Sequence, residues 1–383
     1  MRPALRQLWL AFLRLGLTAF GGPAMVASIR DLAVQRHAWL GEALFQEGIA
    51  LCQAIPGATA MQMAAYVGLR ARGLPGALLA FLGFGLPAFV LMLALSVLYA
   101  EHHDVPRIVS AFAGLQVVVV ALVAHAAWSF GRNLLKTFRD AVTATASAAL
   151  LGAGASPFVV LAAAALSGLV LFKNLRSARS PGPPEASARR TAAPVLLLAG
   201  ALLVGLGGLA AYDRRLFAMA TLMLKIDFFA YGGGFASLPL MLHEVVVIRE
   251  WLDAKVFMDG IALGQLTPGP IVITSTFVGY MVAGLAGALV ATIAIFTPSF
   301  VVLVAAVPFF DRLKASTWLL RATRGMLASF VGLLFFVTAQ FAAAVPWDMA
   351  RVLLFAAGLA GLLRKADPLP VVLAGAAVSV LLF

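Results

Sequence analysis

The stretch Gln53-Ala54-Ile55-Pro56-Gly57 interrupts an apolar region near the start of the chain, and a close copy interrupts a second apolar region 212 residues later. That copy reads Gln265-Leu266-Thr267-Pro268-Gly269. Duplicated apolar segments broken by glycine and proline are typical of a transporter built from two structural repeats. The same landmarks precede each copy in the same order: Phe20-Gly21-Gly22-Pro23 and Trp39-Leu40 in the first, Tyr231-Gly232-Gly233-Gly234 and Trp251-Leu252 in the second.

Composition identifies the class of protein. Hydrophobic residues make up 62% of the 383 residues and charged residues 11%, and the mean hydropathy is +1.00. No soluble globular class has these values. Many of the apolar stretches reach the roughly 20 residues that a helix needs to cross a lipid bilayer. The sequence therefore predicts an all-α polytopic integral membrane protein. Its formal charge of +12 is divided among short basic clusters that anchor loops, so nucleic-acid binding is not expected.

Apolar runs and the breakers between them predict about 13 transmembrane helices, arranged as six, one and six. We expect an N-terminal repeat at 1–172, a basic cytoplasmic linker with a connecting helix at 173–215, and a C-terminal repeat at 216–383. The expected crossings are 4–27, 43–69, 74–100, 107–130, 140–155, 157–172, 194–211, 216–239, 256–283, 285–308, 318–343, 350–365 and 368–383.

The placement of basic residues predicts that the two repeats are inverted. Arg70 and Arg72 lie in the turn before residue 74, whereas the loop at 101–106 has no lysine or arginine. In the second repeat the turn at 282–284 has none, and the segment 311–314 has two. Because basic loops stay in the cytoplasm, equivalent loops of the two repeats face opposite sides, and the connecting helix supplies the odd crossing that inversion needs. Arg214 and Arg215 fall on the outer side and count against this arrangement.

The breaks themselves are candidates for a substrate site. In hydrocarbon, broken helices survive only where protein or a wet cavity satisfies the backbone, and each break creates a half-helix N-terminus that favours an anion. The alternative is that these kinks serve packing alone. The candidate substrate-binding residues at the breaks are Gly21, Gly22, Pro23, Gln53, Pro56, Gly57, Ala58, Thr59, Gly232, Gly233, Gly234, Gln265, Thr267, Pro268 and Gly269.

One cation lies in the first helix of each repeat at the same offset from the glycines. Arg14 precedes Phe20 by six residues, and Lys225 precedes Tyr231 by six. Cations inside spanning segments are costly and usually face a cavity or a counter-ion, so two cations related by pseudo-symmetry would suit a dianion. The alternatives are that both side chains reach the membrane interface, or that Lys225 pairs with Asp227.

Glu47 and Asp259 also match across the repeats and are candidates for proton coupling, with a simple interaction with the helix dipole as the favoured alternative.

Cys52, the single cysteine, excludes an internal disulfide and a multi-cysteine metal site. Phosphate-binding, zinc-hydrolase and nucleophile-elbow motifs are missing. We therefore expect a protein that is not an enzyme and that uses no metal and no cofactor.

With these motifs the chain resembles the chromate ion transporter family, in the two-domain form made of fused homologous halves. The resemblance implies export of chromate across the plasma membrane and chromate resistance, with sulfate as a chemically similar oxyanion. Many members have Pro-Gly-Pro followed by Asn-Ser where this chain has Pro56-Gly57-Ala58-Thr59, and a histidine where Ser28 stands, which leaves the exact substrate open. The resemblance also rests on Tyr66-Val67-Gly68-Leu69-Arg70 and on Gly264-Gln265-Leu266-Thr267-Pro268-Gly269-Pro270.

The sequence thus predicts a multi-pass secondary transporter of the plasma membrane that exports chromate by alternating access around a midplane site. A sulfate or general oxyanion transporter with the same site is one alternative, and an anion channel is another. The assembly is left open, with a homodimer as one arrangement.

Overall fold

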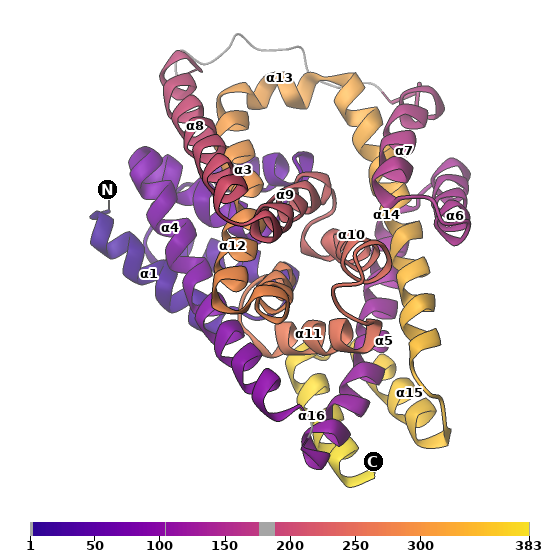
Figure 1. Ribbon diagram of the computed structural model, residues 1–383. Helices are drawn as coiled ribbons and strands as arrows, with labels where there is room; N and C mark the ends of the chain where they lie inside the picture. The colour runs from indigo at the N-terminus through magenta and orange to yellow at the C-terminus, as the bar shows by residue number, and fades with distance from the viewer. Residues whose placement is uncertain (1–2, 104, 176–187, 383) are drawn as a thin grey trace.

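A computed structural model describes residues 3–103, 105–175 and 188–382 (Figure 1). Within these ranges the regular elements are all helices, as the composition predicts. Residues 176–187 of the proposed linker lie outside the described residues. The helices of the first repeat are α1 (Leu5–Thr18), α2 (Gly22–Arg30), α3 (Glu42–Ala54), α4 (Thr59–His102), α5 (Pro106–Leu134), α6 (Phe138–Gly152) and α7 (Pro157–Leu171).

Several helix starts of the first repeat recur in the second. For example, α6 begins at Phe138 and its counterpart α15 at Met349, 211 residues later. Short π-helical segments recur as well, at Asp31–Arg36 and Leu242–Ile248. After the connecting helix α8 (Ala188–Tyr212) come α9 (Arg214–Phe229), α10 (Ser237–Met241), α11 (Ala254–Leu266), α12 (Thr274–Ala306), α13 (Phe310–Ala315), α14 (Thr317–Ala344), α15 (Met349–Leu363) and α16 (Pro368–Leu382).

Five helical stretches in the described chain are long and apolar enough to cross a membrane, and several others are shorter. Because a helix rises about 1.5 Å per residue, 15-residue helices such as α6 and α7 span about 22 Å, less than the thickness of a bilayer core. The five long stretches are Thr59–His102, Pro106–Leu134, Val195–Tyr212, Ile271–Ala315 and Thr317–Ala344.

Helices α4 and α12 are each a tight hairpin of two helical arms. Arg72 and Gly73 leave the helical conformation, with φ of +67° at Gly73, and Gly284 repeats this at +59°. The hydroxyl oxygens of Thr276 and Thr292 are 2.7 Å apart although 16 residues separate them, which a straight helix would hold about 24 Å apart. The turns predicted between the crossings at 43–69 and 74–100, and at 256–283 and 285–308, are confirmed.

The four predicted crossings that contain the breaks are all interrupted. In 43–69 the chain folds back, because the Tyr66 hydroxyl donates to the Leu44 carbonyl over 3.1 Å from the far side of the break. In 216–239 the helix after the break likewise returns to the first, since Lys225 of α9 reaches Glu244. The broken helices that the sequence predicts at these segments are present, but 43–69 and 216–239 are each predicted as one crossing and the chain instead folds back within them. We call α3 with residues 59–71 the first hairpin, and α11 with residues 271–282 the second hairpin.

The two repeats pack by exchanging helices. Helices α6 and α7 lie against α14 of the other repeat, and their counterparts α15 and α16 lie against α5 (Figure 1). Between them α4 packs on α12, with α1 on the outside of α4 and α9 against α12. Small residues permit this close approach: a Cβ placed on Gly332 would be 2.0 Å from the Ala144 carbonyl oxygen. Reciprocal contacts of this kind are those of a two-fold arrangement.

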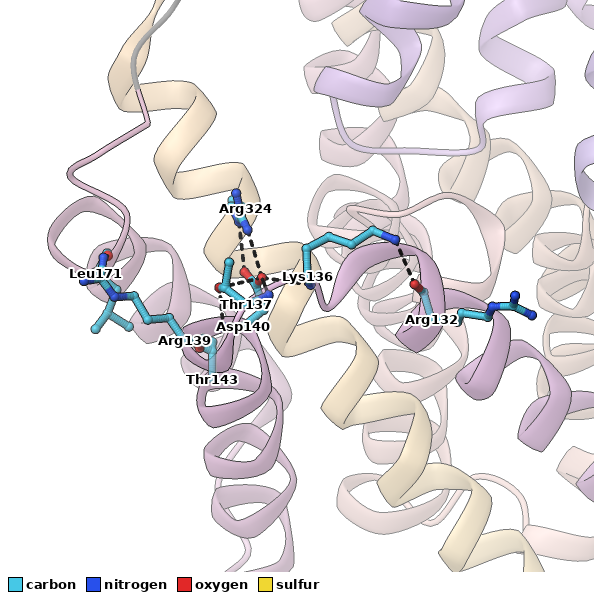
Figure 2. A network of polar contacts seen from close by, with 8 residues as sticks. All are labelled: Arg132, Lys136, Thr137, Arg139, Asp140, Thr143, Leu171 and Arg324. Atoms are coloured by element: carbon cyan, nitrogen blue, oxygen red, sulfur yellow. Dashed lines mark hydrogen bonds and ion pairs between the residues drawn. The ribbon is translucent and has the colours of Figure 1, made fainter.

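A buried ion pair joins α6 to α14. Figure 2 shows the Arg324 guanidinium facing Asp140, with Nε and Nη2 each 2.9 Å from a carboxylate oxygen. Asp140 also accepts the backbone N–H groups of Lys136 and Thr137, so it caps its own helix. The start of α6 is thereby held against the other repeat.

Candidate functional site

The four breaks of the chain meet at the contact between the repeats. The N–H of Gly57, at the tip of the first hairpin, donates to the Ala230 carbonyl over 3.0 Å, where α9 ends. In return the N–H of Gly269, at the tip of the second hairpin, donates to the Ala19 carbonyl over 2.9 Å, where α1 ends. Each repeat therefore satisfies the broken backbone of the other. That these breaks bind a substrate stays a prediction.

Only glycine fits the hairpin tips. Gly57 has φ of +119° and Gly269 has φ of +108°, a region that L-residues with a side chain rarely adopt. A Cβ on Gly57 would also lie 2.3 Å from the Ser299 hydroxyl oxygen, and one on Gly269 would lie 2.8 Å from the Cβ of Ala88. The tips of the two hairpins thus lie directly against equivalent positions, Ala88 and Ser299, on the long arms of α4 and α12.

The glycine run after α9 touches both tips. A Cβ on Gly233 would be 3.4 Å from the Thr59 hydroxyl oxygen, and one on Gly234 would be close to Ile271 and Val272. The corresponding break after α1 is more open, since no described atom lies within 4 Å of a Cβ placed on Gly21. Gly22 and Pro23 begin α2 there; the Pro23 side chain lies outside the described residues.

Several of the expected hydrogen-bond donors are already engaged in this conformation. The N–H groups of Gly57 and Gly269 bind carbonyls, and the Ala58 N–H donates to the Ser299 hydroxyl over 2.8 Å. The Thr267 hydroxyl donates to the Gly264 carbonyl within its own helix. A substrate would have to replace these internal partners. Of the remaining candidates, Pro56 and Pro268 are buried, Thr59, Gly232 and Gln265 are half-buried, and Gln53 is exposed.

The two candidate cations have different surroundings. Lys225 Nζ lies 3.1 Å from Glu244 Oε1 and 3.6 Å from the centre of the Phe158 ring. Lys225 therefore pairs with Glu244, and the alternative that it pairs with Asp227 is wrong. Arg14 is exposed on α1. Helix α1 packs on α4 whereas α9 packs on α12, so the two cations lie on helices with different main packing partners.

The two candidate coupling carboxylates also differ. Asp259 is buried and accepts hydrogen bonds from the Tyr99 hydroxyl and the Gln116 amide, each over 2.9 Å. It lies on the wall of a cavity of about 220 Å³ that Lys255 also lines. Glu47, its counterpart, is exposed. The repeats match in sequence at this position but not in environment.

Sequence reasoning missed a buried polar group behind the first tip. The Asp227 carboxylate accepts hydrogen bonds from the backbone N–H and the hydroxyl of Ser299, over 2.8 and 2.7 Å. The Gln62 amide donates to the Pro56 carbonyl over 2.6 Å. The available signal was a difference between repeats, because the position that corresponds to Asp227 is Gly16.

Comparison with known proteins is consistent with this duplicated architecture. The family described as "Chromate transporter" matches the chain twice, at residues 6–169 and 217–380. An uncharacterized transporter of Methanocaldococcus jannaschii is 42% identical over 97% of this chain and 92% of its own length. The chromate transport protein of Pseudomonas aeruginosa is 32% identical over 96% of this chain and 89% of its own length, and that of Cupriavidus metallidurans is 32% identical over 97% and 92%. No solved structure matches. The chain belongs to the chromate transporter family.

Proposed function

We propose that this protein is a secondary transporter that exports chromate, a tetrahedral dianion, across the plasma membrane and so confers chromate resistance. The observation that carries the proposal is the reciprocal pair of bonds, Gly57 to Ala230 and Gly269 to Ala19, which ties each hairpin tip to the end of the other repeat's first helix. Half-helix N-termini and side-chain-free backbone are suited to an oxyanion. The family relatives named as chromate transport proteins make chromate the first substrate to test.

Alternating access follows from the exchange of contacts between the repeats. In this proposal the repeats at 1–172 and 216–383 are inverted, so opening one tip toward one side is equivalent to opening the other toward the opposite side. When a tip separates from its carbonyl partner, its N–H becomes a donor for a substrate oxygen. Each tip is bonded to the end of the other repeat's first helix. Movement of one repeat would therefore change the contacts at both tips.

Arg14 and Lys225 supply positive charge to this site in the proposal. Each lies within two helical turns of the break that follows its helix. A dianion near Lys225 would compete with Glu244 for the ammonium group. Lys225 then pairs with Glu244 when the site is empty and with the substrate when the site is loaded. Pairing in the empty site avoids leaving a cation unpaired inside the membrane.

Uptake of radiolabelled chromate into inside-out vesicles tests the proposal. We expect saturable uptake by the wild type, loss of uptake in Arg14→Ala and Lys225→Ala, and no loss in Arg312→Ala, which removes an exposed cation from α13. Unaltered uptake in both of the first variants would remove these residues from the site. Saturable sulfate uptake without chromate uptake would make sulfate the substrate, and a conductance that does not saturate would indicate a channel.

A further inference from the structure

We propose that Asp227, Ser299 and Gln62 form a proton-binding site behind the tip of the first hairpin, and that the proton bound there is coupled to movement of that tip. The inference rests on the proposed transport function and adds the coupling ion to it. It places coupling at a different carboxylate from the two, Glu47 and Asp259, that the sequence nominates.

Two buried oxygen atoms at this place lack a hydrogen-bond donor. Asp227 and Gln62 are both fully buried, and neither Asp227 Oδ1 nor Gln62 Oε1 has a partner anywhere in the described chain. The other atom of each group is engaged: Asp227 Oδ2 accepts from Ser299, and Gln62 Nε2 donates to the Pro56 carbonyl. Buried polar atoms are normally hydrogen-bonded. Two buried acceptor oxygens without a donor are therefore suited to binding a proton or another cation.

Ser299, which binds Asp227, and Gln62 face the same glycine at the hairpin tip. A Cβ on Gly57 would lie 2.3 Å from Ser299 Oγ and 2.8 Å from Gln62 Nε2. Ser299 Oγ accepts the Ala58 N–H while it donates to Asp227, so one hydroxyl joins the carboxylate to the tip. The state of Asp227 therefore determines how strongly Ser299 is held, and Ser299 in turn holds Ala58.

Charged neighbours do not neutralise Asp227. On its own helix Lys225 is turned to Glu244 and the Phe158 ring, and on the π-helical segment Glu244 is shared between Lys225 and Arg249. On the long arm of α12, Asp227 accepts hydrogen bonds from the N–H and the hydroxyl of Ser299. No ion pair to Asp227 occurs in the described chain. Burying an unpaired carboxylate is costly, and a proton from water, bound at Oδ1, removes the charge and turns that atom into a donor.

The second hairpin has no such group, although its tip also has a glycine with a positive φ, Gly269. The positions that correspond to Asp227 and Ser299 are Gly16 and Ala88, and where Gln62 follows the tip glycine by five residues the second hairpin has Thr274. The Thr274 hydroxyl donates to the Ile271 carbonyl of its own segment. A need for packing alone would apply equally at both tips, whereas a single ionisable group behind one of two equivalent tips provides one proton site per transporter.

Reconstituted vesicles test the inference by two modes of transport. In the wild type we expect an imposed pH gradient, at clamped membrane potential, to change net chromate flux at least several-fold, and chromate to exchange for chromate across the membrane. Asp227→Asn should lose the response to the gradient and keep exchange, because it retains the shape of the side chain but binds no proton in this range. Asp213→Asn, which keeps a helix cap at the start of α9, should behave as the wild type.

The outcomes separate failure of this inference from failure of the transport function. No saturable chromate flux in either mode would refute the transport function itself. Four results would each overturn the proton site. Two concern the wild type: chromate flux that does not change with the pH gradient, or flux that responds to a sodium gradient instead. The other two concern variants: a full pH response in Asp227→Asn, or loss of the pH response in Asp259→Asn alone. If Asp227→Asn fails to fold, Ser299→Ala, which copies the residue of the other repeat, takes its place. It should change the pH dependence of flux, and an unchanged profile would overturn the site.

Discussion

Asp140 and Arg324 lie 184 residues apart in the chain and bind each other by two parallel hydrogen bonds of 2.9 Å across the boundary between the repeats. The Asp140 carboxylate has no exposed surface, whereas the Arg324 side chain is 27% exposed. Breaking a buried ion pair leaves an uncompensated charge and can cost about 3 kcal/mol or more, reduced here by the partial exposure of Arg324. This contact therefore fixes how α6 lies on α14.

We expect Asp140→Asn to lower the thermal unfolding midpoint of the detergent-solubilised protein clearly, by an amount that corresponds to about 2 kcal/mol. The matched control is Asp348→Asn, which alters an exposed carboxylate that pairs with the half-buried Arg351 at the start of α15 and should cost less than about 1 kcal/mol. Equal midpoints for the two variants would contradict a role for Asp140 in holding the repeats together. Arg324→Ala should cost more than Asp140→Asn, because it leaves the buried carboxylate unpaired.

At the first hairpin tip we expect Gly57→Ala to abolish chromate uptake. Its Cβ would enter the space of the Ser299 hydroxyl at a backbone conformation that costs about 1 to 3 kcal/mol for a residue other than glycine. Gly154→Ala is the control, because Gly154 also has a positive φ, of +86°, but no described atom lies within 4 Å of its Cβ position. Transport should survive that change. Loss of uptake in both variants would mean that backbone strain, and not the close contact at the tip, is the cause.

The sequence was sufficient for the repeats, the breaks and the turns at Gly73 and Gly284, because glycine, proline and apolar runs are local signals. It did not indicate that the chain folds back at the breaks, since a proline-glycine pair is equally compatible with a kinked crossing and with a hairpin. The distinction depends on contacts such as Tyr66 to Leu44. Those contacts are tertiary and leave no periodic pattern.

Side-chain pairing was harder to predict than the positions of the breaks. The alternative that Lys225 pairs with Asp227 relied on nearness in sequence, yet residues two apart on a helix do not face each other. Lys225 instead meets Glu244, 19 residues later, and Asp227 meets Ser299, 72 residues later. Comparing the repeats position by position would have singled out Asp227, because glycine occupies the same place in the first repeat.

The pairing of Lys225 gives a test of its role in transport. If Lys225 neutralises the substrate, Glu244→Gln should free the ammonium group and lower the KM for chromate several-fold, while Lys225→Ala should abolish uptake. If the pair serves structure alone, Glu244→Gln and Lys225→Ala should both lower the unfolding midpoint and leave the KM unchanged in the protein that remains folded. Measuring KM and unfolding midpoint on the same preparations separates the two roles, with Arg249 still available as a partner for Glu244 in the lysine variant.

The turns of α4 and α12 provide a test of the duplicated architecture itself. A Cβ on Gly68 would lie 2.2 Å from the Gly76 carbonyl oxygen, and a Cβ on Gly279 would lie 2.3 Å from the Gly287 carbonyl oxygen. Backbone atoms cannot move aside as a flexible side chain can. Gly68→Leu should therefore force the two arms of α4 apart, and Gly279→Leu should do the same to the two arms of α12. We expect both to abolish a monodisperse peak in size-exclusion chromatography, whereas Gly207→Leu, on the outward face of α8, should leave it intact. If only one of Gly68→Leu and Gly279→Leu is tolerated, the two repeats differ in how closely the arms of α4 and of α12 must pack.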